Sequence, residues 1–136
     1  MAFVFQGNPD NFDIDTCLAR PFIYWRVPQL SHEMRIGDQI VIWRSGSLAG
    51  AIALGRITEE PNERRNVKHP EALDNDIWVA SQEGPSTIQA GVSIDEVRLS
   101  IEDGMVTREV CKNDSILKQN SIITNPQGTV FRLSND

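Results

Sequence analysis

The stretch from Phe22 to Ile57, FIYWRVPQLSHEMRIGDQIVIWRSGSLAGAIALGRI, contains the longest apolar runs of the chain and decides its fold. Its aromatic and β-branched residues are typical of strands, and turn signals divide it into three of them. The first predicted strand covers Phe22 to Trp25 and is ended by Pro28, which has no N–H to donate to a sheet. We therefore expect a fold built on a sheet with this stretch at its centre.

The second and third strands of this stretch are predicted to form a hairpin. Gly37-Asp38 marks a turn, and apolar residues alternate in the strand Gln39–Trp43 that follows it. Ser45-Gly46-Ser47 marks a second turn, after which the strand Leu48–Ile57 begins. Two strands joined by so short a turn are expected to pair antiparallel.

Small residues alternate along the third strand, at Ala49, Ala51, Ala53 and Gly55. Because side chains alternate along a strand, these four are predicted to share one face. Two interpretations of such a face stay open. Either another element packs closely against it, or it is the floor for a flat ligand.

The rest of the chain is predicted to form short strands and helices, without repeats or linkers. Further strands are predicted at Phe3–Gln6, Ile77–Ala80, Val92–Ile101 and Thr129–Leu133. A short helix is predicted over Phe12–Ala19, and a longer helical segment over Val106–Ile122. The polar segment Glu59–Asn75 is predicted to be an exposed loop.

Length and cysteine usage indicate one ordinary soluble domain. The 136 residues suffice to bury a core without stabilising cross-links, and no apolar run nears the roughly 20 residues that span a bilayer. No membrane partner is therefore expected. Cys17 and Cys111 lie far apart and lack metal-ligand spacing, which favours buried free thiols in a cytoplasmic protein over a disulfide.

The net charge of −6 opposes binding to a polyanion, yet the basic residues are unevenly distributed. Five arginines fall in or beside the central stretch: Arg20, Arg26, Arg35, Arg44 and Arg56. A local basic face is therefore compatible with the negative average. If nucleic acid is the ligand, Arg26 and Arg44, which directly follow tryptophans, are predicted to contact its backbone.

Taken in order, several motifs resemble those of EVE domains, a branch of the PUA-like superfamily related to YTH and ASCH domains. The motifs that carry the resemblance are Phe3–Gln6 leading into Asn8-Pro9, Tyr24-Trp25, Gly37-Asp38 before Ile40, Ile42 and Trp43, Leu54–Ile57, and Asn125–Phe131 with Leu133-Ser134. The resemblance implies a single α+β domain over residues 1–136, with a PUA-like mixed β-barrel or curved sheet and short flanking helices. In that family a helix commonly continues from the position of Ser134-Asn135-Asp136. The chain is therefore expected to be either such a domain by itself or the N-terminal domain of a longer protein.

The resemblance to YTH-like readers implies a non-enzymatic module that reads a methylated nucleobase flipped into an aromatic pocket of DNA or RNA. It implies Trp25 and Trp78 as cage residues and Asn8 as the polar contact to the base edge. Ile88 is a candidate third wall, and Trp43 is either a pocket wall or a core residue. The pocket hypothesis expects Trp25 to face a cavity mouth, so that its loss affects binding more than stability.

Two other functions stay open on the sequence. One is a small-molecule or nucleoside amidohydrolase of the ASCH kind, which uses a Lys, Thr and Glu constellation. The available lysines, Lys68, Lys112 and Lys118, all lie in polar segments, and His32 and His69 have no nucleophile or ligand spacing nearby. We therefore expect no catalytic residue, metal or cofactor.

The other open function is a protein-interaction domain without a ligand pocket. If nucleic acid is the ligand, a fused or associated nuclease or NTPase is an expected partner. The identity of the modified base depends on pocket dimensions, and the sequence does not decide it.

Overall fold

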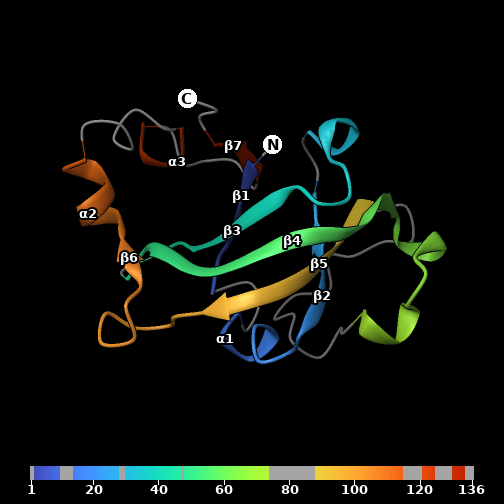
Figure 1. Ribbon diagram of the computed structural model, residues 1–136, viewed down its shortest axis with the longest axis horizontal. Helices are drawn as coiled ribbons and strands as arrows, with labels where there is room; N and C mark the ends of the chain where they lie inside the picture. The colour runs from blue at the N-terminus through green and yellow to red at the C-terminus, as the bar shows by residue number, and fades with distance from the viewer. Residues whose placement is uncertain are drawn as a thin grey trace.

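The computed structural model of the protein describes residues 2–9, 14–27, 30–46, 48–73, 88–114, 121–124 and 130–133 (Figure 1). Within these ranges the chain forms strands and short helical segments. In chain order these are β1 (Ala2–Gly7), α1 (Ile14–Cys17), β2 (Phe22–Arg26), η1 (Ser31–Glu33), β3 (Gln39–Arg44), β4 (Gly50–Glu63), η2 (Arg64–Asn66), η3 (Pro70–Ala72), β5 (Ile88–Val97), β6 (Val106–Thr107), α2 (Arg108–Lys112), α3 (Ser121–Thr124) and β7 (Val130–Arg132).

The described strands form one mixed sheet in the order β2-β5-β4-β3-β1-β7, with β6 paired to β4. β1 pairs parallel with β3, and every other pairing in this sheet is antiparallel. β3 and β4 form the predicted hairpin. The prediction of an α+β fold with a curved mixed sheet and short helices is confirmed. Among the described strands β2 and β7 do not pair, so the curved sheet is open rather than a closed barrel.

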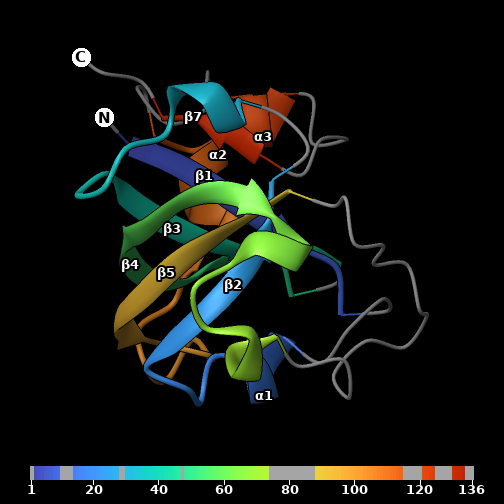
Figure 2. The same cartoon turned by 90° about the vertical axis from the view of Figure 1, so that its right-hand side faces the viewer.

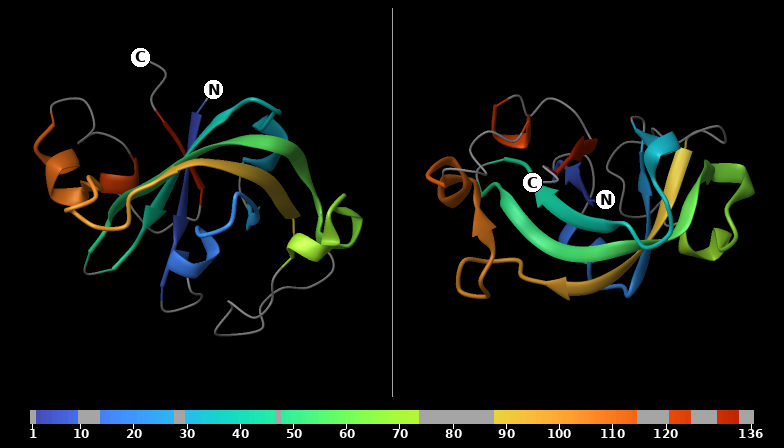
Figure 3. Two further views of the ribbon diagram at one scale, coloured as in Figure 1. Left: turned by 60° about the horizontal axis from the view of Figure 1, so that its bottom comes forward. Right: turned by 45° about the horizontal axis from the view of Figure 1, so that its top comes forward.

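The curvature brings β2, at one end of the sheet, close to β1, the strand next to the other end (Figure 3). β1 and β2 are separated by β3, β4 and β5 in the sheet order, yet the rings of Phe5 and Trp25 stack with centroids 6.2 Å apart. Side chains from the two strands can meet only if the sheet curls around the space between them. In Figure 2 the end of β2 converges with β1, which marks this meeting place.

Each face of the sheet carries its own hydrophobic core, because side chains alternate along every strand. On β1, Phe3 and Phe5 belong to the larger inner core and Val4 to the outer one. α1 contributes Ile14 and Cys17 to the inner core, whereas α2 and α3 cover the outer core. The outer core consists of Val4, Trp43, Cys111, Ile122, Ile123 and Phe131.

β4 is longer than predicted and replaces much of the expected loop. It continues to Glu63, and the η2 and η3 turns follow in the described part of the segment expected to be exposed. The register of β4 against β5 shifts between Ile57 and Glu59. This irregularity places Glu59 on the same side of the sheet as Tyr24, where it is buried. The polar composition of the segment predicted a loop, but the segment contains a strand in which the charged Glu59 is hydrogen-bonded to Tyr24.

The small residues of β4 do not share one face. Ala49 and Ala51 pack against the outer core, but Ala53 belongs to the inner core. The register shift opposite Ile42 and Trp43 adds one residue and reverses the alternation. A Cβ at Gly50 would lie 2.5 Å from the carbonyl oxygen of Val106, so the small residues here admit β6 rather than a ligand.

Other predictions fare unevenly. The helix expected over Val106–Ile122 is broken into β6, α2 and α3, with residues 115–120 outside the described ranges. The strand expected at Ile77–Ala80 also lies outside them. Both cysteines are buried and free, as predicted. None of the helices in the described part of the chain is long and apolar enough to cross a membrane.

Candidate nucleic-acid interface

Trp25 lies on the inner face of β2, where that strand approaches β1. It is opposite Ala90 of β5, the residue is 4% exposed, and its ring is stacked on Phe5 at an interplanar angle of 19°. Ile88 is two residues from Ala90 on the same strand, so it shares this face, and it packs against the same core. The structure thus brings two of the predicted pocket residues, Trp25 and Ile88, to one place.

The burial of Trp25 corrects the expectation that it faces a cavity mouth. With Phe5, Ala90 and Ile23 around it, the indole is part of the inner core in this structure. Truncation of Trp25 would therefore remove core packing as well as any stacking surface. A role in binding has to be tested with a substitution that keeps an aromatic ring.

Asn8 follows the last residue of β1 and is exposed. The strand end is held in place because the backbone N–H of Ser45 donates to the carbonyl oxygen of Gly7 at 2.9 Å. The Ser45 hydroxyl donates to the same oxygen at 3.3 Å. β1 also supplies Phe5, which contacts Trp25, so Asn8 follows the indole's stacking partner by three residues in the chain, just beyond the end of β1. Its contact with a base stays a prediction.

Trp43 and Trp25 cannot line one pocket, because they lie on opposite faces of the sheet. Trp43 is 3% exposed and packs in the outer core under α2 and α3. Sequence reasoning left its role open between wall and core, and the alternation of β3 places it in the core. Trp78 lies outside the described residues, so its proposed place in the cage stays a prediction.

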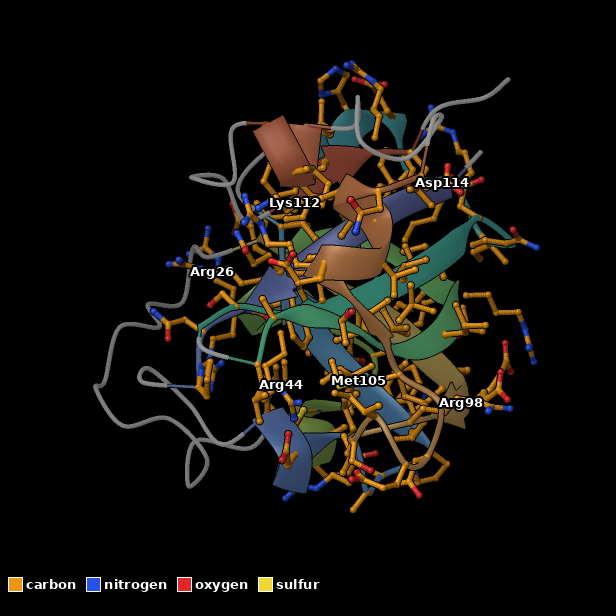
Figure 4. All side chains as sticks on the ribbon, turned by 90° about the vertical axis from the view of Figure 1, so that its left-hand side faces the viewer. Arg26, Arg44, Arg98, Met105, Lys112 and Asp114 are labelled. Atoms are coloured by element: carbon orange, nitrogen blue, oxygen red, sulfur yellow. The ribbon has the colours of Figure 1, made fainter. Side chains whose placement is uncertain are left out.

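Arg44 conflicts with its predicted role at a nucleic-acid backbone, because its guanidinium is used inside the protein. It donates to the Asp15 carboxylate at 3.2 Å, to the carbonyl oxygen of Leu99 at 2.9 Å and to that of Leu48 at 3.3 Å. Arg44 is 8% exposed, and Figure 4 shows it beside Met105. A guanidinium with these internal partners is not available for a phosphate.

Arg26 differs from Arg44 in position, although both directly follow a tryptophan. It is the last residue of β2, is partly exposed and lies nearer the edge of the molecule in Figure 4. Its side chain leaves β2 on the opposite face from Trp25. Of the two arginines predicted to contact a backbone, Arg26 is the one whose location allows it.

Sequence reasoning missed a polar cluster on the outer side of β2. The Tyr24 hydroxyl donates to the Glu59 carboxylate at 2.6 Å and accepts from the backbone N–H of His69 at 2.9 Å. Burial, together with the hydrogen bond to Glu59, raises the pKa of Tyr24 above its ordinary value. Gly91, a glycine within a strand, was the sequence signal for a close approach here.

The described residues offer no arrangement for catalysis at the Trp25 face. No group of His, Cys, Asp and Glu in the described ranges could hold a metal ion. The side chains of His32 and His69 are 83% and 57% exposed and lie beside single carboxylates. Lys112 is paired with Glu109 on α2 at 3.7 Å. The residues around Trp25 in the inner core are aromatic and aliphatic.

Comparison with solved structures places this fold among known ones, although no protein-family model and no curated protein matches the sequence. The DUF55 domain of human thymocyte nuclear protein 1 is similar with a TM-score of 0.67 at 15% identity, over 99% of this chain and 92% of that one. Human THYN1 in complex with DNA containing 5-methylcytosine is similar with a TM-score of 0.66 at 12% identity, over 98% and 91% of the two chains.

A third similar structure is a variant of the ASCH protein from Zymomonas mobilis. Its TM-score is 0.56 at 11% identity, over 98% of this chain and 89% of that one. These identities are low, and what the three similarities establish is the fold. The chain has the PUA-like curved-sheet fold seen in the DUF55, or EVE, domain of THYN1 and in ASCH proteins.

Proposed function

We propose that this protein is a non-enzymatic nucleic-acid-binding module that accepts a modified base where β2 meets β1. The observation that carries the proposal is the fold shared with human THYN1, whose solved structure contains 5-methylcytosine DNA. The aromatic and aliphatic character of the inner face around Trp25 supports it. In that setting a base removed from its stack gains roughly 1–3 kcal/mol from aromatic contact.

The proposed site consists of Trp25 as the stacking surface, Ile88 as an apolar wall and Asn8 as the polar contact to the base edge. Ile88 is fixed near Trp25 because the backbone N–H of Val27 donates to its carbonyl oxygen at 3.0 Å. A methyl group on the base would gain from apolar contact with such walls. Trp78 is included as a second stacking residue. Arg26 supplies the contact to the backbone.

Trp43 and Arg44 are left out of the proposed site. Trp43 belongs to the core on the other face, and the guanidinium of Arg44 is held by Asp15 and two carbonyl groups. Both residues provide controls, because each has the same side chain as a proposed site residue but a structural position.

The test is a binding panel of matched modified and unmodified oligonucleotides, DNA and RNA, at one stated salt concentration. For the wild type we expect a preference for one modified base. Trp25→Phe, which keeps a ring but reduces the stacking surface, should lower that preference by about tenfold, corresponding to a loss within the range for base stacking. Trp43→Phe is the matched control and should leave the preference unchanged. A preference unaltered by Trp25→Phe would contradict the site, and equal binding of modified and unmodified strands by the wild type would contradict the function.

A second candidate function is an amidohydrolase of the ASCH kind, which rests on the fold likeness to the Zymomonas mobilis protein. It needs a lysine near the proposed site, and the two described lysines, Lys68 and Lys112, are exposed. Release of product from modified nucleosides incubated with the protein would favour this function. Absence of binding to every oligonucleotide and nucleoside would instead favour a protein-interaction domain.

A further inference from the structure

Tyr24 and Glu59 are joined across an intervening strand on the outer side of the sheet. Tyr24 on β2 is opposite Gly91 on β5, and Glu59 on β4 is opposite the same glycine. The hydroxyl of Tyr24 therefore reaches over β5 to the Glu59 carboxylate, at 2.6 Å. The bond links two strands that are not neighbours in the sheet.

Two local features of the chain make this bond possible. The register shift between Ile57 and Glu59 turns the Glu59 side chain to the side on which Tyr24 lies. Gly91 leaves the space between them open, since a Cβ there would lie 2.6 Å from Cβ of Glu59 and 2.9 Å from Cζ of Phe22. A bulge and a glycine at matching positions indicate a built arrangement rather than a chance surface contact.

The same pair also holds the segment that follows β4. The second carboxylate oxygen of Glu59 accepts from the backbone N–H of Lys68 at 3.1 Å, and the Tyr24 oxygen accepts from that of His69 at 2.9 Å. The rings of Phe22 and His69 meet edge to face, with centroids 5.7 Å apart. β2, β4 and the segment through η2 and η3 are thus fastened at one point, which we call the Tyr24–Glu59 clasp.

Glu59 is 7% exposed, and in the described part of the chain its carboxylate is bound by neutral donors and by no cation. A carboxylate buried in this way depends on its hydrogen bonds, because each one lost leaves a desolvated acceptor. The clasp is therefore sensitive to small changes in its donors. Its strength comes from Tyr24, the residue directly before Trp25.

We propose that Tyr24 and Glu59 are positioning residues that set the selectivity of the base site by holding β2 and its Trp25 in place. This inference rests on the proposed function. Among the described strands β2 is at the end of the sheet and pairs only with β5. A short edge strand held from one side can tilt or slip, and a slip of one residue would turn Trp25 to the other face. The clasp ties β2 to β4 as well and so opposes that motion.

The experiment compares three variants. Tyr24→Phe removes the hydroxyl and keeps the ring, and Gly91→Ala pushes Glu59 and Phe22 apart. Ser93→Ala is the matched control, because it removes a hydroxyl bonded to Thr58 at 3.0 Å on β5 and β4 without touching the clasp. Two readouts are taken at a temperature where all variants are folded. These are the ratio of affinities for modified and unmodified oligonucleotides, and the NMR chemical shift and hydrogen-exchange rate of the Trp25 indole N–H.

We expect Tyr24→Phe and Gly91→Ala to lower the affinity ratio by about threefold to tenfold, as for residues that act through another residue. Both should also shift the Trp25 indole resonance and speed its exchange, whereas Ser93→Ala should do neither. A lower Tm with the ratio and the indole resonance unchanged would overturn the proposal and leave the clasp purely structural.

The two readouts separate this inference from the proposed function. If the wild type shows no preference for any modified base, the proposed function fails. An unchanged indole resonance in Tyr24→Phe overturns the positioning role whatever the wild type binds.

Discussion

Trp25 and Trp43 are buried to the same degree, 4% and 3% exposed, but they lie in different cores on opposite faces of the sheet. The outer core around Trp43 is covered by α2 and α3, which close over it. The inner core around Trp25 lies where β2 and β1 approach each other without pairing. Equal burial therefore occurs in two different settings, because of these two tryptophans it is Trp25 that lies on β2, the strand at the end of the sheet.

The arginines that follow the two tryptophans also differ in their surroundings, and each lies on the opposite face of the sheet from its tryptophan. Arg44, after the outer tryptophan, donates to Asp15 of α1 and to two carbonyl groups. Arg26, after the inner tryptophan, ends β2 near the edge of the molecule. At each pair the alternation of the strand sends neighbouring side chains to opposite faces. The same Trp-Arg dipeptide thus exposes its cation in one place and buries it in the other.

The largest expected effect comes from deleting either indole. Trp25→Ala and Trp43→Ala should each lower the free energy of unfolding by about 3–5 kcal/mol, since each removes a large side chain from a packed core. Urea unfolding followed by circular dichroism measures it. A loss below about 1 kcal/mol at Trp25 would show that its surroundings collapse or open without cost, and would restore the expectation of a cavity mouth.

The next effect separates the two arginines. Arg44→Gln should lower the free energy of unfolding by about 1–3 kcal/mol, because the Leu99 and Leu48 carbonyl oxygens lose a charged donor. Arg26→Gln should lower it by less, because Arg26 is partly exposed whereas Arg44 is 8% exposed. On the proposed function Arg26→Gln should instead weaken binding to modified and unmodified strands alike and reduce the salt slope by about 1. Thermal unfolding and salt-dependent titration of both variants give the comparison, which fails if the two arginines behave the same way.

The smallest effect is a pH dependence of the exposed ion pair between β7 and η1. Arg132 of β7 hydrogen-bonds Glu33 of η1 and holds the pKa of that carboxyl below its ordinary value. A depressed pKa contributes stability that is present above the ordinary value of 4.5 and is lost as the pH falls below it. The Tm difference between wild type and Glu33→Gln should therefore be constant above that pH and shrink below it. A difference independent of pH would mean that the pair does not act through its charge.

From the sequence it was possible to predict the curved mixed sheet, the β3–β4 hairpin and the buried free cysteines. The hairpin depends on signals that lie close together in the chain, such as the turn at Gly37-Asp38 and the alternation of apolar residues after it. The curved mixed sheet was implied by the family resemblance, and the free thiols by the wide separation of Cys17 and Cys111. The PUA-like resemblance likewise rests on motifs that keep their order along the chain. Such local patterns can be read from the sequence because a strand that buries one face alternates apolar and polar residues.

Tertiary structure decided which residues meet. Nothing near Trp43 in the sequence marks the register shifts that reverse the alternation of β4, yet these shifts divide the alanines between two cores and turn Glu59 toward Tyr24. The internal partners of Arg44 come from segments up to 61 residues away in the chain. A one-residue bulge changes the face of every side chain beyond it, and the pattern that specifies the bulge is spread over two strands. The sequence could therefore propose the site residues, but only the folded sheet decided which face each of them occupies.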